Sequence, residues 1–125
     1  MKRKLLVIDD EPGIQLILEH YFANEYEVVL TANGRDAMAW LDQGHRVDVV
    51  VADCEMPFMN GLDFILALRN TAAHQHTPLM MLSSTDDVAN KISCLKQGAD
   101  DYLVKPFNPE ELEIRIKKIL DRVRA

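Results

Sequence analysis

Residues 4–11 read Lys-Leu-Leu-Val-Ile-Asp-Asp-Glu (KLLVIDDE), a short apolar run that ends in three consecutive acids. A short run that is apolar on both of its faces is typical of a strand buried on both sides. The acids mark the point at which the chain leaves the core. This stretch therefore predicts an interior strand with carboxylates at its carboxyl end.

The same arrangement recurs along the chain. Further short apolar runs, which we predict to be strands, occupy residues 27–31, 47–52, 78–82 and 102–104. Segments with apolar residues at helical spacing begin near residues 12, 33, 61, 86 and 108. Five apolar strands that alternate with five amphipathic helices predict an α/β fold, a doubly wound parallel sheet between two helical layers.

Local signals support the helix boundaries. Pro12 stands at the start of one predicted helix, and Asn33 and Asn108 are residues that cap helices well. Gly98 suits the left-handed position that ends a helix. Pro78 stands at the first position of its strand, where a missing N–H is tolerated.

Composition narrows the class of protein. The chain has 125 residues, 48% of them hydrophobic and 27% charged, as expected for one globular domain. The net charge of −6 does not favour binding to nucleic acid or to an anionic membrane. No apolar run approaches the ~20 residues that span a bilayer. Cys54 and Cys94 are expected to be reduced thiols, as in a cytoplasmic protein.

The acids at the strand ends are the informative feature. Asp9 and Asp10 follow the first strand, and Asp53 follows the third. Ligands of doubly wound sheets bind beyond the carboxyl ends of the strands, where the strand order reverses. If the first and third strands are neighbours, these three carboxylates converge, and only a cation keeps them all ionised. Mg²⁺ suits such oxygen ligands and leaves one carboxylate free to attack a phosphoryl group. The simpler alternative is that these acids are solvated loop residues or helix caps.

Two more strand ends carry polar groups. Ser83 and Ser84 follow the fourth strand, and Lys105 follows the fifth. A hydroxyl and an ammonium at this edge can both reach a phosphoryl oxygen on Asp53. Lys105–Pro106 is also a candidate cis peptide bond. Considered singly, an ordinary turn serine and a surface lysine are the alternatives.

Three stretches together resemble the response-regulator receiver (CheY-like) family of two-component signal transduction. They are VIDDE at residues 7–11, DCEMPFMNG at 53–61 and GADDYLVKPF at 98–107. The resemblance covers essentially the whole chain. It implies a flavodoxin-like (βα)5 fold with strand order 2-1-3-4-5 and a single receiver domain over residues 1–125.

The resemblance also implies roles for individual residues. Asp53 would be the phosphoacceptor, and Asp10 and Asp53 would bind Mg²⁺ directly. Asp9 would act through water, and Glu55 would offer its backbone carbonyl to the metal. No other cofactor is expected.

The remaining roles belong to a switch. Ser83 would be the hydroxyl that moves to the phosphoryl group, and Lys105 the lysine that contacts phosphate. Tyr102 would be the aromatic residue that turns inward when Ser83 moves. The alternative for Tyr102 is a half-buried aromatic residue at the edge of the sheet.

The function implied is that of a phosphorylated switch and not of a turnover enzyme. A histidine kinase or phosphotransfer protein would donate the phosphoryl group, and water would later remove it in autodephosphorylation. An output domain or downstream protein would respond. The domain itself is expected to bind neither nucleic acid nor a membrane, and to be cytoplasmic.

Some positions depart from the common pattern of the family. Cys54 follows the phosphoacceptor where a larger apolar residue is usual, and Glu55 places an acid beside the site. An extra carboxylate there can slow anionic phosphodonors or alter dephosphorylation.

Related winged-helix regulators often dimerise through the fourth helix, fifth strand and fifth helix. Lys91, Asp100, Asp101 and Arg115 fit the paired charges of that surface. Lys96 stands where those regulators usually have Glu, which argues against the same dimer.

Three alternative functions use related folds. A haloacid-dehalogenase-like phosphatase also has an Asp nucleophile, but in a DxD pattern after the first strand, which Asp9-Asp10-Glu11 lacks. A flavodoxin needs a hydroxyl-rich phosphate loop at that same place. A pseudo-receiver usually lacks one of the acids or the lysine, all of which are present here. The chain is either a stand-alone receiver or part of a longer regulator or hybrid kinase.

Overall fold

The computed structural model describes residues 2–124. Within them, five strands form one parallel sheet: β1 (Arg3–Ile8), β2 (Tyr26–Thr31), β3 (Val49–Asp53), β4 (Leu79–Ser83) and β5 (Asp101–Val104). The sheet has the order β2-β1-β3-β4-β5, which confirms the predicted doubly wound topology. Of the single domain predicted over residues 1–125, Met1 and Ala125 lie outside the described residues.

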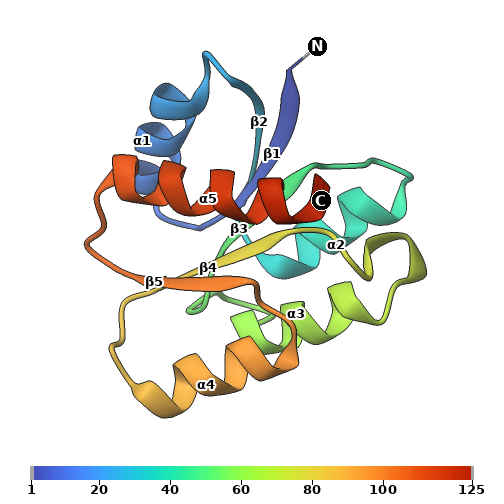
Figure 1. The fold of residues 1–125 in the computed structure, drawn as a ribbon. Coiled ribbons are helices and arrows are strands. Elements are labelled where there is room, and N and C mark those ends of the chain that lie inside the picture. The colour runs from blue at the N-terminus through green and yellow to red at the C-terminus, as the bar shows by residue number, and fades with distance from the viewer. Residues whose placement is uncertain (1, 125) are drawn as a thin grey trace.

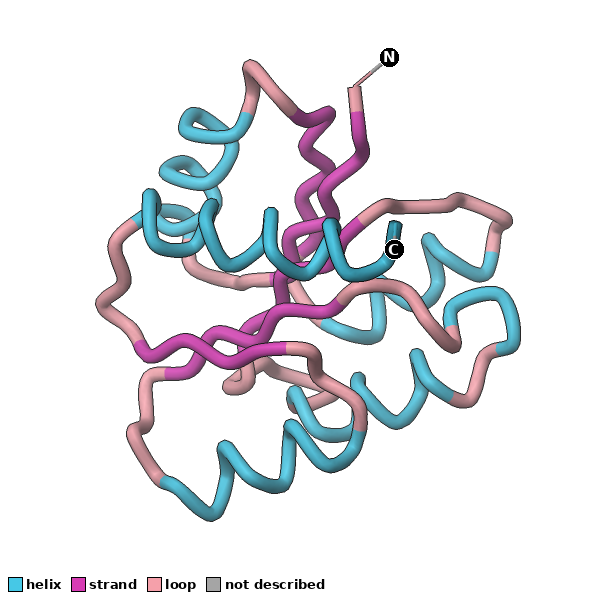
Figure 2. Tube along the Cα trace, viewed as in Figure 1, coloured by secondary structure: helices cyan, strands magenta, loops and turns pink. Residues whose placement is uncertain are grey.

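Helices cover both faces of the sheet, as Figure 1 shows. They are α1 (Pro12–Phe22), α2 (Gly34–Asp42), α3 (Gly61–Arg69), α4 (Val88–Gln97) and α5 (Pro109–Arg124). Helices α1 and α5 pack on one face, and α2, α3 and α4 pack on the other. The strands run through the middle of the molecule between these two layers (Figure 2).

The inner strands β1, β3 and β4 are largely buried because each contributes apolar side chains to both layers. In β1, Leu5 and Val7 belong to the core under α1 and α5, whereas Leu6 and Ile8 belong to the core under α2, α3 and α4. This alternation follows from the two-residue repeat of a strand. It explains why the inner strands carry continuous apolar runs, such as Leu5 to Ile8, and not an apolar side chain at every second residue.

The predicted helix caps are present. The side-chain oxygen of Asn33 accepts a hydrogen bond of 2.9 Å from the backbone N–H of Asp36, at the start of α2. The Asn108 side chain accepts one of 2.8 Å from the N–H of Glu110, at the start of α5. Gly98 ends α4 with φ of +130°, a conformation that side chains rarely adopt.

The structure differs from the predictions in details. Asp53 and Ser83 are the last residues of β3 and β4 and do not follow them. A short 3₁₀ helix at Ala72–His74, which carries no apolar repeat, was not predicted. Ile17 and Leu18 both belong to the apolar repeat at helical spacing in α1, but Leu18 is buried and Ile17 is 50% exposed, because this helix buries only a narrow stripe against the sheet.

The first turn of α3 packs closely against the end of β3. The N–H of Gly61 donates to the carbonyl of Cys54 at 2.8 Å, and a Cβ at Gly61 would lie 2.7 Å from the Cα of Cys54. Backbone atoms cannot rotate away from such a clash. The close approach at Gly61 therefore holds the loop after Asp53 against the sheet.

We predict that Gly61→Ala lowers the free energy of unfolding by about 2 kcal/mol or more, because the new methyl group displaces backbone next to Asp53. Urea denaturation measures the change. Gly13→Ala is the matched control, since a Cβ there meets no atom of the described residues within 4 Å. Alanine is also the better helix former, so this control should be neutral or stabilising. Equal stability of the two variants would contradict the prediction.

Candidate functional site

Three acids meet at the carboxyl end of the sheet. Strands β1 and β3 are neighbours, with Ile8 paired to Ala52, so Asp9 and Asp53 occupy the same level. One carboxylate oxygen from each of Asp9, Asp10 and Asp53 lies within 4.8 Å of the others. Asp9 is 1% exposed and Asp53 4%, whereas Asp10 is open to solvent. The structure thus brings together the three acids singled out in the sequence.

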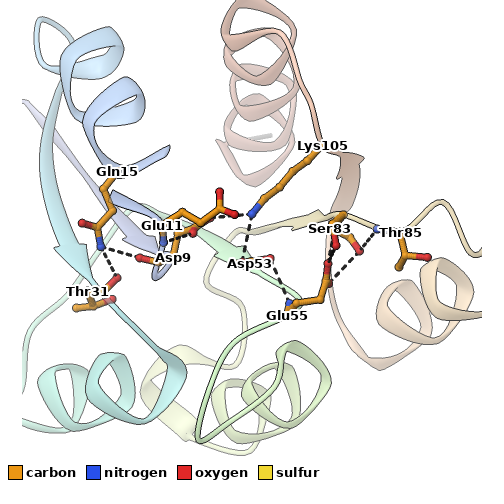
Figure 3. A network of polar contacts seen from close by, with 10 residues as sticks. Asp9, Glu11, Gln15, Thr31, Asp53, Glu55, Ser83, Thr85 and Lys105 are labelled. Carbon is orange, nitrogen blue, oxygen red and sulfur yellow. Dashed lines mark hydrogen bonds and ion pairs between the residues drawn. The ribbon is translucent and has the colours of Figure 1, made fainter. Parts of the chain in front are cut away.

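Lys105 reaches into this cluster from the end of β5, and Figure 3 shows its ammonium group between two of the acids. Its Nζ lies 3.1 Å from Oδ2 of Asp9 and 3.2 Å from Oδ2 of Asp53. Its backbone N–H donates to the carbonyl of Ser83 at 2.7 Å, and the Lys105–Pro106 peptide bond is cis. One ammonium group therefore faces three carboxylates, which leaves the site short of positive charge.

Burial dominates the titration of the central acid. It raises the pKa of Asp53 to about 6, and the charge of Asp9 acts in the same direction. The N–H of Glu55 and the ammonium group of Lys105 oppose this rise without cancelling it. Burial alone would lower the pKa of Lys105, but its hydrogen bond to Asp9 and the two negative charges prevail and raise it.

The carboxylates have the chemistry of a site for a hard divalent cation. Buried like charges repel each other, and oxygen ligands with access to water suit Mg²⁺. Both oxygens of Asp9 already accept hydrogen bonds, one from the N–H of Glu11 at 2.9 Å and one from Lys105. The same holds for Asp53, whose Oδ1 accepts from the N–H of Glu55 and whose Oδ2 lies 3.2 Å from Lys105, so Asp10 is the acid of the three that is most open to a metal ion.

The Glu55 side chain makes contacts that were not predicted. Its carboxylate accepts a hydrogen bond of 3.0 Å from the Ser83 hydroxyl and one of 2.6 Å from the N–H of Ser84. The Ser84 hydroxyl also donates to it. The only signal in the sequence was an acid at an unusual place, two residues after Asp53. The predicted metal contact through the Glu55 backbone carbonyl stays a prediction.

Tyr102 lies beneath the loop between β4 and α4. It is 4% exposed, and its hydroxyl accepts a hydrogen bond of 2.8 Å from the Asn90 side chain. The same hydroxyl donates to the carbonyl of Thr85 at 3.3 Å. Tyr102 is thus buried and not half-buried on the edge strand β5, and it links α4 to this loop, while its role in a switch stays a prediction.

Within residues 2–124, no helix combines the length and the apolar composition needed to cross a bilayer.

Comparison with known proteins agrees with this geometry. A family model described as "Response regulator receiver domain" matches residues 5–117. The "Probable transcriptional regulator ycf27" of Porphyridium aerugineum is 42% identical over 123 residues, which are 98% of this chain and 50% of that protein. The chain spans about half the length of the curated relatives it matches.

Solved structures share the fold over nearly the full chain. The receiver domain of the Francisella response regulator 1452 is 34% identical, with a TM-score of 0.88 over 98% of this chain and 99% of that one. The receiver domain of the sensor histidine kinase PA1611 from Pseudomonas aeruginosa PAO1 is 25% identical, with a TM-score of 0.87 over 97% and 99%. That protein has a magnesium ion coordinated in its active site cleft. This chain belongs to the response regulator receiver domain family of two-component systems.

Proposed function

We propose that this receiver accepts a phosphoryl group on Asp53 in a Mg²⁺-dependent reaction and changes conformation to control an output domain or partner. The donor is the phosphohistidine of a histidine kinase or phosphotransfer protein. The observation that carries the proposal is the ammonium group of Lys105, 3.1 Å from Asp9 and 3.2 Å from Asp53 within a cluster of three acids. In that arrangement Asp53 is the nucleophile, Lys105 is a fixed cation, and the carboxylates are ligands for a second cation, Mg²⁺.

In the transfer step, a carboxylate oxygen of Asp53 attacks the phosphorus atom in line with the bond to histidine. The new oxygen–phosphorus bond forms as the phosphorus–nitrogen bond breaks, and the electron pair stays on the imidazole, which takes a proton from solvent. Lys105 stabilises the negative charge of the phosphoryl oxygens.

The residues that would hold Mg²⁺ are Asp10, Asp53 and the Glu55 backbone carbonyl, with Asp9 acting through water. When bound, Mg²⁺ supplies positive charge that offsets the charge of the phosphoryl group. The raised pKa of Asp53 supports this assignment, since burial leaves its negative charge undercompensated by Lys105 alone.

The switch would use Ser83 and Tyr102. A phosphoryl oxygen on Asp53 attracts the Ser83 hydroxyl, and the loop that follows β4 shifts with it. Tyr102 contacts that loop through Thr85, so the change reaches the surface formed by α4 and β5. This is a shift between two packings, driven by charge-assisted hydrogen bonds. Water then hydrolyses the acyl phosphate and restores Asp53, so the domain acts on itself and does not turn over a separate substrate.

The partners follow from the family. Receiver domains work with histidine kinases and output domains, and this chain spans about half the length of relatives that are transcriptional regulators. We therefore propose that any contact with nucleic acid belongs to an output domain and not to this acidic one. The proposed location is cytoplasmic, where such partners act.

The proposal includes a phosphorylation-dependent homodimer through α4, β5 and α5, although Lys96 departs from the paired charges of the winged-helix regulators. The charges expected to pair between copies have partners within the chain here: Asp101 lies 3.0 Å from Arg115, and Asp100 lies 3.4 Å from Arg69. Dimerisation through them requires an exchange of partners. Lys91 is exposed and available for such a contact.

We predict that Asp53→Asn abolishes labelling by acetyl phosphate and Mg²⁺, because the amide is not a nucleophile. Intact-mass spectrometry measures the labelled fraction. Asp42→Asn, a change at an exposed acid that ends α2, is the control and should be labelled like the wild type. An Asp53→Asn protein labelled as fully as the wild type would show that another residue is the acceptor.

Lys105→Ala should leave Mg²⁺ binding largely intact but slow phosphorylation by roughly tenfold or more, since it removes a cation aimed at the phosphoryl oxygens and not a metal ligand. Calorimetric titration with Mg²⁺ and the rate of labelling by acetyl phosphate separate these two effects. Loss of Mg²⁺ binding with an unchanged labelling rate would exclude the role given to Lys105.

The raised pKa of Asp53 predicts a pH-dependent effect on stability. The folded protein holds the Asp53 proton more tightly than the unfolded chain does, so ionisation of Asp53 costs stability as the pH rises from the ordinary carboxyl value to about 6. Without Mg²⁺, Asp53→Asn should raise the free energy of unfolding at pH 7.5 by about 1–2 kcal/mol.

Urea denaturation at pH 7.5 and pH 4.5 tests this effect. The gain should shrink at the lower pH, where Asp53 is largely protonated in the folded wild type. A gain that is equal at both values, or a loss at pH 7.5, would show that burial does not disfavour the Asp53 charge.

A further inference from the structure

The Glu55 carboxylate occupies a compact set of hydrogen-bond donors. It accepts from the Ser83 hydroxyl, the Ser84 N–H and the Ser84 hydroxyl, although Glu55 is exposed to solvent. An exposed glutamate ordinarily stays mobile in water, and holding it in one geometry costs side-chain entropy. Three donors that converge on one carboxylate oppose this cost and favour a single geometry for Glu55.

These donors form an anion site beside the acceptor. Ser83 is fully buried, and the Glu55 N–H donates to Oδ1 of Asp53 at 3.2 Å, so the donors and the acceptor are joined through one residue (Figure 3). A hydroxyl and a backbone N–H that bind a carboxylate have the chemistry to bind a phosphoryl oxygen. A phosphoryl group on Asp53 would need the same Ser83 hydroxyl that Glu55 now holds.

We propose that the Glu55 side chain is an internal occupant of the phosphoryl site, which holds Ser83 and Ser84 before phosphorylation and must be displaced by the phosphoryl group. This inference rests on the proposed function and adds a residue that tunes it. Two effects of Glu55 both slow phosphorylation. Its carboxylate occupies the hydrogen-bond donors of Ser83 and Ser84, and its negative charge repels an anionic phosphodonor.

The contacts around the loop give the proposal a second consequence. The N–H of Thr85 donates to the Ser83 hydroxyl oxygen at 3.1 Å, and Tyr102 donates to the Thr85 carbonyl. Glu55 thus holds, through Ser83, the loop that packs over the inward Tyr102. Phosphorylation replaces the Glu55 carboxylate with a phosphoryl group at this loop. We therefore expect the surroundings of the Tyr102 ring to change less on phosphorylation of the wild type than on phosphorylation of a protein without the Glu55 side chain.

The test compares wild type with Glu55→Gln and Glu55→Ala at saturating Mg²⁺, so that a change in metal affinity does not enter. Glu55→Gln removes the charge, and Glu55→Ala removes the contacts as well. We expect acetyl phosphate to label Glu55→Ala about fivefold faster than wild type, and beryllofluoride to bind about fivefold more tightly, as expected for the loss of a competing charge-assisted contact. The labelling rate and the beryllofluoride affinity of Glu55→Gln should lie between those of wild type and Glu55→Ala.

Asp86→Asn is the matched control. It removes one negative charge from the loop between β4 and α4, which the Glu55 side chain contacts, and Asp86 is exposed with no side-chain hydrogen bond or ion pair among the described residues. This variant should behave like wild type. NMR adds a readout that is independent of phosphorylation: in the unphosphorylated protein, the amide signal of Ser84 should shift in Glu55→Ala, and the Tyr102 ring signals should then respond more to beryllofluoride than in wild type.

The outcomes separate the two proposals. If wild type is labelled on Asp53 but neither Glu55 variant is labelled faster than Asp86→Asn, the role of Glu55 is refuted and the proposed function stands. If wild type takes up neither acetyl phosphate nor beryllofluoride, the proposed function fails and this inference falls with it.

Discussion

The site depends on one ammonium group placed between two buried carboxylates. Asp9 and Asp53 are almost inaccessible to solvent, and two negative charges at such proximity are unfavourable without a cation. Lys105 supplies it at 3.1 and 3.2 Å. The parallel register of β1 and β3 sets the acids side by side, and β5 delivers the lysine to the same edge of the sheet. The remaining deficit of positive charge makes the cluster receptive to a divalent ion.

Much of this arrangement was predictable because it follows from chain direction. Parallel strands end at the same edge, so acids that follow the first and third strands meet once those strands are neighbours. The caps at Asn33 and Asn108 were predictable for a similar reason, since a cap acts within a few residues. The Glu55 bridge to Ser83 was not, because it spans 28 positions and depends on how the loops after β3 and β4 pack. The exposure of Ile17 also depends on packing, as its place in the helical repeat does not define which stripe faces the sheet.

The loop after β4 connects the chemistry to the surface. Ser83 faces Glu55 on one side and Thr85 on the other, and Thr85 in turn contacts Tyr102. A change of anion at Ser83 therefore acts on a loop that already packs over a buried aromatic ring. Under the proposed function, this connection is the route by which a phosphoryl group on Asp53 would alter α4 and β5.

A crystal structure of the protein with Mg²⁺ and beryllofluoride would show whether Asp53 is both the phosphoacceptor and a metal ligand. We expect one Mg²⁺ bound by Asp10, Asp53 and the Glu55 backbone carbonyl, with beryllofluoride on the Asp53 carboxylate and the Lys105 ammonium group against a fluorine atom. Mg²⁺ held without Asp53, or beryllofluoride bound to another side chain, would contradict it.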